Sequence, residues 1–340
     1  MKSVISKILI ISLAFNSFYF LNAQVKVDYN KVGAYKYQLQ FMAFSKHPDA
    51  IAFEKNVRKI SDFFITNSET MKNRKGFDLK MITYGARWND RTAEWTIKPV
   101  RPYQFGLRGE LVFLFQLFLT NGNQWTVEPP YMKLYINETE TGGHAGLLND
   151  GEANSELKKY FFVSTLRSEI APGVHYYNSL TNTSGQIVVF NPKRAPYWLP
   201  VTVRELTQAK LNYYKNGSES DKAVYDFIKP IVDAMGEEEL NAPAFYGSED
   251  AILNVNGKGQ GLQIMKFNPD YWDRTLPPSS IQYITIFYNE FGYNCADENC
   301  WKSKKAEFYR DNGHSEFWEE ITKEIPLEKL GNLIDKKIKY

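Results

Sequence analysis

The histidines are the first residues of this sequence to examine for chemistry. There are four of them, at His47, His144, His175 and His314. None belongs to an H-E-x-x-H motif, the helical arrangement of zinc proteases. His314 is followed by Glu319 and Glu320, but residues five and six positions apart do not share a helix face as residues four apart do. This cluster therefore indicates a solvated helix start.

Glu138, Glu140 and His144 form a second cluster around Gly142 and Gly143. Carboxylate and imidazole groups are metal ligands, but no complete set of three or four ligands is visible at this place. A polar surface loop that follows a strand explains the same residues. We therefore predict no metal and no cofactor.

The glycine-rich run from Gly257 to Gly261 has glycines at every second residue. A phosphate-binding loop needs a helix N-terminus directly after it, whereas this run leads into a predicted strand. A hairpin or loop is the better interpretation. No G-x-S-x-G motif marks a serine nucleophile. Two carboxylates could cleave glycosides, but with 39 acids in the chain only their spacing in the fold would identify such a pair.

Aromatic residues make up 15% of the chain, which is unusually high. Several form pairs near predicted strand ends or in loops, and the clearest are Tyr197–Trp198 and Tyr271–Trp272. Exposed Tyr and Trp rings stack on sugars and anchor protein partners. We therefore take Tyr197, Trp198, Tyr271 and Trp272 as candidate ligand-binding residues. The alternative is that they pack the ends of the core.

Residues 1–23 have the pattern of an export signal. Lys2 and Lys7 precede an apolar run that starts at Ile8, and the segment ends in a small residue, Ala23. We expect cleavage after Ala23 and export to the periplasm or the cell exterior. The remaining chain has 39 Lys and Arg against 39 Asp and Glu. This balance argues against nucleic acid as a partner, and no later segment is apolar enough to span a membrane.

Cys295 and Cys300 are the only cysteines. In an oxidising compartment two cysteines so close in sequence favour a structural disulfide. A redox pair is the alternative, but the four intervening residues do not match the C-x-x-C spacing.

Hydrophobic periodicity predicts the order of elements. Residues 49–72 form a helix with Phe53, Val57, Ile60 and Phe64 on one stripe. Strands are expected at 78–84, 111–119, 131–137, 160–168 and 186–190, and the apolar strand at 111–119 should be covered on both faces. Helices follow at 202–214 and 221–238, the latter capped by Ser220 and kinked or split at Pro230. A loop-rich stretch, strands at 262–267 and 281–288, and helices at 314–323 and 326–339 complete the chain.

Because the strands come in runs, the sequence predicts an α+β fold with antiparallel sheets and flanking helices. Residues 24–215 would form one domain and 216–340 a smaller α+β region, unless both belong to one continuous domain. A repeated Asn-Pro followed by aromatics leaves a duplication open. We expect an exported binding or structural protein that contacts a glycan or an envelope protein. An exported glycan hydrolase with paired carboxylates, or a subunit of an envelope assembly, is the alternative; the sequence does not decide whether the chain is an enzyme.

Overall fold

The computed structural model of the chain describes residues 27–40, 48–85, 105–124, 129–138, 145–147, 156–177, 186–247, 253–289 and 323–335. The predicted export signal, the proposed Cys295–Cys300 disulfide and all but the last residue of the helix expected at 314–323 lie outside these ranges. Helices combine with two largely antiparallel sheets, so the predicted α+β class is confirmed. None of the helices in the described ranges is long and apolar enough to cross a lipid bilayer.

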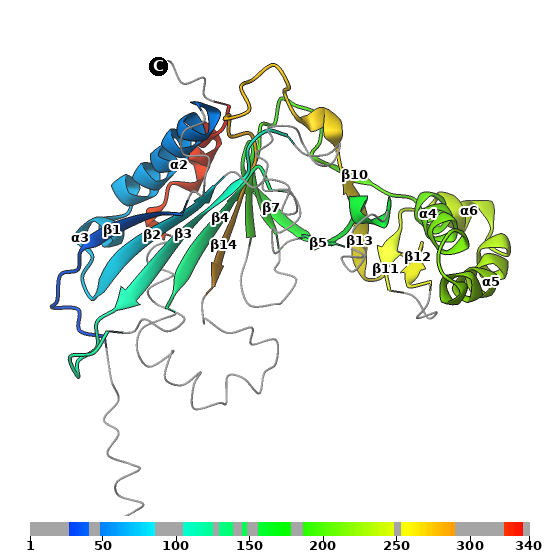
Figure 1. The fold of residues 1–340 in the computed structure, drawn as a ribbon, viewed down its shortest axis with the longest axis horizontal. Coiled ribbons are helices and arrows are strands. Elements are labelled where there is room, and N and C mark those ends of the chain that lie inside the picture. Colours follow the sequence, from blue (N-terminus) through cyan, green and yellow to red (C-terminus); the bar gives the residue numbers. More distant parts are fainter. Residues whose placement is uncertain are drawn as a thin grey trace, which may run out of the picture.

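Eight strands form the larger sheet, in the spatial order β1-β2-β3-β4-β14-β9-β8-β7 (Figure 1). Their bounds are β1 Tyr35–Gln40, β2 Phe77–Gly85, β3 Gly109–Leu117, β4 Tyr131–Ile136, β7 Leu166–Ala171, β8 Val174–Tyr177, β9 Gln186–Val189 and β14 Ile284–Asn289. Only β1 and β2 pair in parallel, and the remaining pairs are antiparallel.

The second sheet is smaller and carries the order β12-β11-β13-β6-β5, with β10 also paired to β13. Its strands are β5 Ala145–Leu147, β6 Tyr160–Val163, β10 Trp198–Pro200, β11 Phe245–Tyr246, β12 Val255–Asn256 and β13 Leu262–Phe267. Two short 3-10 helices adjoin it, η1 Glu156–Lys159 and η2 Pro269–Tyr271. The stretch expected to be loop-rich, residues 240–261, thus contributes the short strands β11 and β12.

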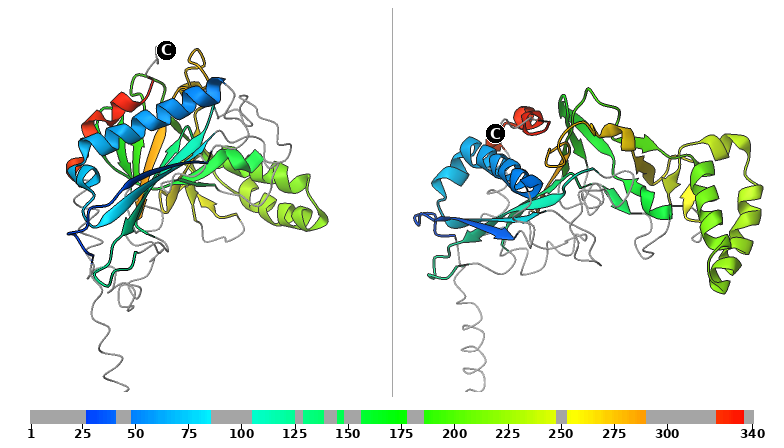
Figure 2. Two further views of the ribbon diagram at one scale, coloured as in Figure 1. Left: turned by 60° about the vertical axis from the view of Figure 1, so that its left-hand side comes forward. Right: turned by 45° about the horizontal axis from the view of Figure 1, so that its top comes forward.

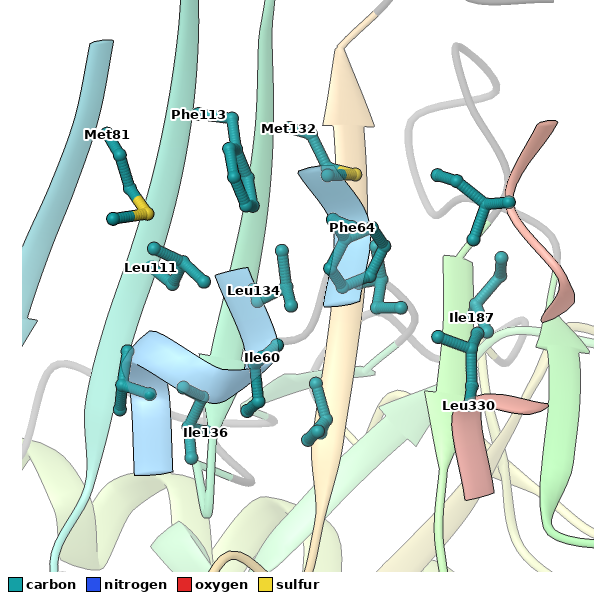
Figure 3. Packing of buried hydrophobic residues seen from close by; sticks show 14 of the residues in the cluster. Ile60, Phe64, Met81, Leu111, Phe113, Met132, Leu134, Ile136, Ile187 and Leu330 are labelled. Atoms are coloured by element: carbon teal, nitrogen blue, oxygen red, sulfur yellow. The ribbon is translucent and has the colours of Figure 1, made fainter. Parts of the chain in front are cut away.

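One face of the larger sheet is covered by helix α2, Pro48–Asn67, which is followed by the short α3, Glu69–Asn73 (Figures 1 and 2). The predicted stripe of α2 is confirmed, because its four apolar side chains are all at most 1% exposed: Phe53, Val57, Ile60 and Phe64. They pack on inward-facing strand residues such as Leu111, Phe113 and Leu134 (Figure 3). This packing removes apolar surface of the larger sheet from water and so stabilises it.

The C-terminal segment covers the other half of the same face. Instead of the α-helix predicted at 326–339, the described part forms a 3-10 helix, η3, Leu327–Leu333. Gly331 lies within it, and glycine disfavours the interior of an α-helix. Leu330 is fully buried against the sheet core. Glu324, just before η3, accepts hydrogen bonds from the hydroxyl groups of Ser68 and Thr70 and so fastens this segment to α3.

Helices α4, Val203–Lys215, α5, Glu219–Asp233, and α6, Glu237–Asn241, pack on the smaller sheet at the opposite end of the molecule (Figure 1). The predicted cap Ser220 is wrong: Ser218 caps α5, because its hydroxyl accepts from the Asp221 amide while the Asp221 carboxylate accepts from the Ser218 amide. The helix continues through Pro230 and does not split there. It ends at Asp233, and α6 begins at Glu237 after its N-cap residue Gly236, so the helix predicted at 221–238 is divided there.

The predicted domain boundary at residue 215 falls at the end of α4, between elements that pack together. Helices α4 and α5 lie on either side of that position and share one hydrophobic cluster. Strand β14 follows it by almost 70 residues, yet pairs with β4 and β9, which precede it. A boundary at 215 therefore separates strands that are hydrogen-bonded to each other.

Candidate functional site

The structure brings the four predicted binding aromatics together, but in the interior. Tyr197, Trp198, Tyr271 and Trp272 are each at most 6% exposed. They belong to a cluster between the two sheets, here called the aromatic cluster, whose rings are Phe105, Phe161, Tyr177, Phe190, Tyr197, Trp198, Phe267, Tyr271, Trp272 and Tyr283. A stacking platform needs rings that face solvent, so packing in the core explains the positions of these four residues.

The hydroxyl groups inside the aromatic cluster are hydrogen-bonded. The Tyr197 hydroxyl lies 2.7 Å from both the Nδ1 atom of His175 and the hydroxyl of Tyr177. The Tyr271 hydroxyl donates to the Gln282 carbonyl at 2.6 Å. Burial raises the pKa of Tyr197 well above its ordinary value, so this phenol stays protonated and cannot act as a base. The hydroxyl groups of Tyr177, Tyr197 and Tyr271 therefore have hydrogen-bond partners within the core.

Of the group Glu138, Glu140 and His144, only Glu138 lies in the part of the chain that the structure describes. Glu138 is buried and forms an ion pair with Arg108, at 3.2 Å between Oε1 and Nη1. Glu140 and His144 lie outside the described ranges. Among the described residues, no three His, Cys, Asp or Glu side chains converge as metal ligands would.

A different site lies on the larger sheet, on the face opposite α2. It is a hollow of about 450 Å³, here called the sheet hollow, lined by Tyr84, Glu110, Val112, Leu114, Tyr131, Lys133 and Tyr135. Strand β2 contributes the first of these residues, β3 the next three and β4 the last three. Strand β3 is buried on both faces over most of its length, as predicted: on the side of the hollow Glu110 and Val112 are buried and Leu114 is partly exposed.

Strand alternation places these residues on one face. Along β4, Tyr131, Lys133 and Tyr135 are half-buried, whereas the residues between them are buried on the side of α2. The register then aligns a row across three strands, because Tyr84 lies opposite Glu110 and Glu110 lies opposite Tyr135. Cross-strand neighbours of this kind stand close enough for their side chains to touch.

An ion pair occupies the centre of the sheet hollow. The Nζ atom of Lys133 lies 2.6 Å from a carboxylate oxygen of Glu110, and the two side chains are 25% and 8% exposed. The same ammonium group lies 4.7 Å from the centre of the Tyr135 ring, a cation–π distance. The hollow thus offers hydrogen-bond donors and acceptors held between aromatic rings.

The sheet hollow would need a pair of carboxyl groups in its lining to act as a glycan hydrolase. Its described lining contains one carboxylate, Glu110, and the buried carboxylate of Glu138 nearby in sequence is paired with Arg108. Glycoside hydrolysis needs one carboxyl that holds a proton and a second that is ionised. Glu110 is paired with Lys133 and Glu138 with Arg108, so the described lining does not present two separate carboxyl groups side by side.

The sheet hollow was not predicted, although part of the residue pattern that forms it can be seen in the sequence. The alternation Tyr-x-Lys-x-Tyr in the strand predicted at 131–137 puts three polar or aromatic side chains on one face. Tyr84 and Glu110 could not be added, because the register between distant strands is not written in local periodicity. The glycine-rich run at 257–261 leads into β13, and no helix follows it, in agreement with the loop interpretation.

No protein-family model matches the chain, and neither the curated proteins nor the solved structures include a significant match.

Proposed function

We propose that this chain is an exported binding protein that takes a glycan in the sheet hollow. The observation that carries the proposal is the group of three tyrosines, Tyr84, Tyr131 and Tyr135, around the Glu110–Lys133 ion pair. Export rests on the signal pattern of residues 1–23.

Sugar rings present an apolar face of C–H groups and an edge of hydroxyl groups. Tyrosine provides an amphipathic ring for the first, and charged side chains provide hydrogen bonds for the second. The Glu110 carboxylate accepts hydrogen bonds and the Lys133 ammonium donates them. A neutral ligand also fits the site, because the charges of Glu110 and Lys133 cancel.

Binding is tested with the purified protein on an array of β-glucans, chitin oligosaccharides, mannans and peptidoglycan fragments, followed by calorimetry with the best ligand. Tyr84→Ala is expected to weaken binding about tenfold, since loss of one stacked ring removes about 1–1.5 kcal/mol. Tyr246→Ala is the matched control, because Tyr246 lies outside the hollow and is as exposed as Tyr84, 37% against 38%.

Two results would overturn the proposal. One is an array on which no glycan binds above background. The other is an equal loss of affinity in the Tyr84→Ala and Tyr246→Ala variants, which would place the ligand elsewhere. Retained folding of both variants is checked by their thermal unfolding curves.

A further inference from the structure

Helix α5 presents apolar side chains to solvent although it is amphipathic. Ile228 is its only buried residue. Ala223, Phe227, Pro230 and Ala234, the C-cap residue, lie on one exposed stripe, at spacings of three and four residues. Phe227 is 53% exposed, the only phenylalanine among the exposed large apolar residues that the structure describes. Such a stripe marks an interaction surface more often than a single exposed side chain does.

The stripe leads into a hollow of about 450 Å³ between α5, α6 and the β11–β12 hairpin, here called the helix–hairpin groove. Ile231 on α5 and Met235, between α5 and α6, line one side of it, Tyr246 on β11 lines another, and Val255 is buried at its floor. Met235 suits a surface that must adapt to a partner, because methionine is flexible and polarisable.

The glycine-rich run completes the wall of this groove. Gly261 has a φ angle of +97°, and a Cβ atom there would lie 2.1 Å from the Tyr246 carbonyl oxygen. Only glycine lets the chain pass so close to β11. Lys258 and Gln260 of the same run stand on the rim.

The surroundings of the groove are acidic. Helix α5, helix α6 and residues 253–261 carry seven carboxylates and three lysines. Three of these carboxylates, at Glu219, Asp233 and Glu237, are in ion pairs. Among the described residues, Asp221, Asp226, Glu238 and Glu239 have no ion-pair partner. Glu239 and Lys258 both line the groove itself, so the excess negative charge lies on α5 and α6 beside it. A partner that carries positive charge beside its apolar side chains would therefore complement this surface.

We propose that the helix–hairpin groove and the adjoining stripe of α5 dock an amphipathic helix of a partner protein, with apolar side chains one turn apart and Lys or Arg beside them. The exposed stripe runs over twelve residues, from Ala223 to Ala234, and is about 16 Å long, which matches three turns of such a helix. One apolar anchor enters the groove next to Met235 and a second packs on Phe227. This surface stands at the end of the molecule farthest from α2 (Figure 2), so it leaves the sheet hollow free.

The proposal is tested by fluorescence anisotropy with two labelled 18-residue peptides that share a leucine stripe and differ in flanking Lys or Glu. The Lys peptide is expected to bind the protein at least tenfold more tightly than the Glu peptide, and less tightly as salt is added. Phe227→Ala is expected to weaken the Lys peptide about tenfold, because it removes a central aromatic anchor. Ile51→Ala is the control, since Ile51 is an exposed apolar residue of α2.

A charge reversal tests whether the acidic side chains select the peptide, or whether it binds through nonspecific apolar contacts. Asp226→Lys combined with Glu239→Lys is expected to invert the preference, so that the Glu peptide binds more tightly. Equal binding of both peptides to the unmodified protein, or unchanged binding in Phe227→Ala, overturns the proposal. So does sedimentation that shows a dimer of this chain which Phe227→Ala dissociates, because the occupant is then a second copy.

Discussion

At the scale of single residues, His175 is a group whose charge state near neutral pH depends on the fold. Its ring is half-buried against Phe190, with ring centres 4.4 Å apart, and its Nδ1 atom contacts the Tyr197 hydroxyl. Burial lowers the pKa of His175 from its ordinary value of 6.5, although the negative charge of Glu169 opposes this. The folded protein therefore favours the neutral imidazole.

This shift predicts a stability that falls in acid. Below pH about 6.5 the unfolded chain binds a proton at this histidine more readily than the folded chain does, so acidification favours unfolding. The free energy of unfolding of the unmodified protein should decrease between pH 7 and pH 5. In His175→Asn, which keeps a hydrogen-bonding group near Tyr197, the decrease should be smaller. Denaturant titrations at both pH values measure the free energy of unfolding. An equal decrease in the unmodified protein and in His175→Asn would contradict the prediction.

At the scale of elements, the packing of α2 is decided by which side of the helix faces the sheet. Phe63 and Phe64 are neighbours in sequence with edge-to-face rings 5.6 Å apart. Phe64 is 1% exposed and also contacts Phe113 of β3, whereas Phe63 lies at the margin of the core. The same substitution at Phe63 and at Phe64 therefore compares a marginal with a fully buried position of α2.

Phe64→Ala is expected to destabilise the protein by about 3–5 kcal/mol, because it removes buried apolar surface and leaves a cavity. Phe63→Ala should cost clearly less, since water and neighbouring side chains can fill the space at the margin. Chemical denaturation monitored by circular dichroism gives both values. A larger loss of stability in Phe63→Ala than in Phe64→Ala would mean that Phe63, and not Phe64, faces the sheet.

At the scale of the whole molecule, five layers follow one another: α2 with η3, the larger sheet, the aromatic cluster, the smaller sheet and helices α4–α6 (Figures 1 and 2). Arg194 connects several of them. Its guanidinium donates to Asp335 at 2.7 Å and to the side chain of Gln282, and Asn191 donates to the same Asp335 at 2.6 Å. Asp335 follows η3, so this network ties the C-terminal segment to the region between the sheets.

Asp335→Ala is expected to destabilise the protein by about 2–3 kcal/mol, because it leaves the largely buried Arg194 without its main acceptor. Asp233→Ala, which breaks the exposed ion pair with Lys229 on α5, should change stability little. Thermal unfolding compares the two variants. Equal effects would show that the Asp335 network contributes no more than a surface pair.

The sequence by itself determined which side of each element is apolar. The stripe of α2 and the alternation along β4 both follow from local spacing, since side chains repeat every 3.6 residues in a helix and every second residue in a strand. It also determined the α+β class, because strands in runs pair with one another. Boundaries were less well defined: Ser218 and Ser220 are equally good caps by type, and only the hydrogen bonds to Asp221 distinguish them.

Only the tertiary structure decided what covers each apolar side. In sequence, aromatic pairs such as Tyr197–Trp198 and Tyr271–Trp272 have the same pattern when they bind a ligand and when they pack in a core. The second sheet, which lies over β8 and β9, buries them. The sheet hollow likewise depends on the register in which β2, β3 and β4 pair. The strand on the other side of β4 is β14, which comes some 150 residues farther along the chain. Local periodicity carries no information about such partners, because the free energy that selects them comes from contacts between distant segments.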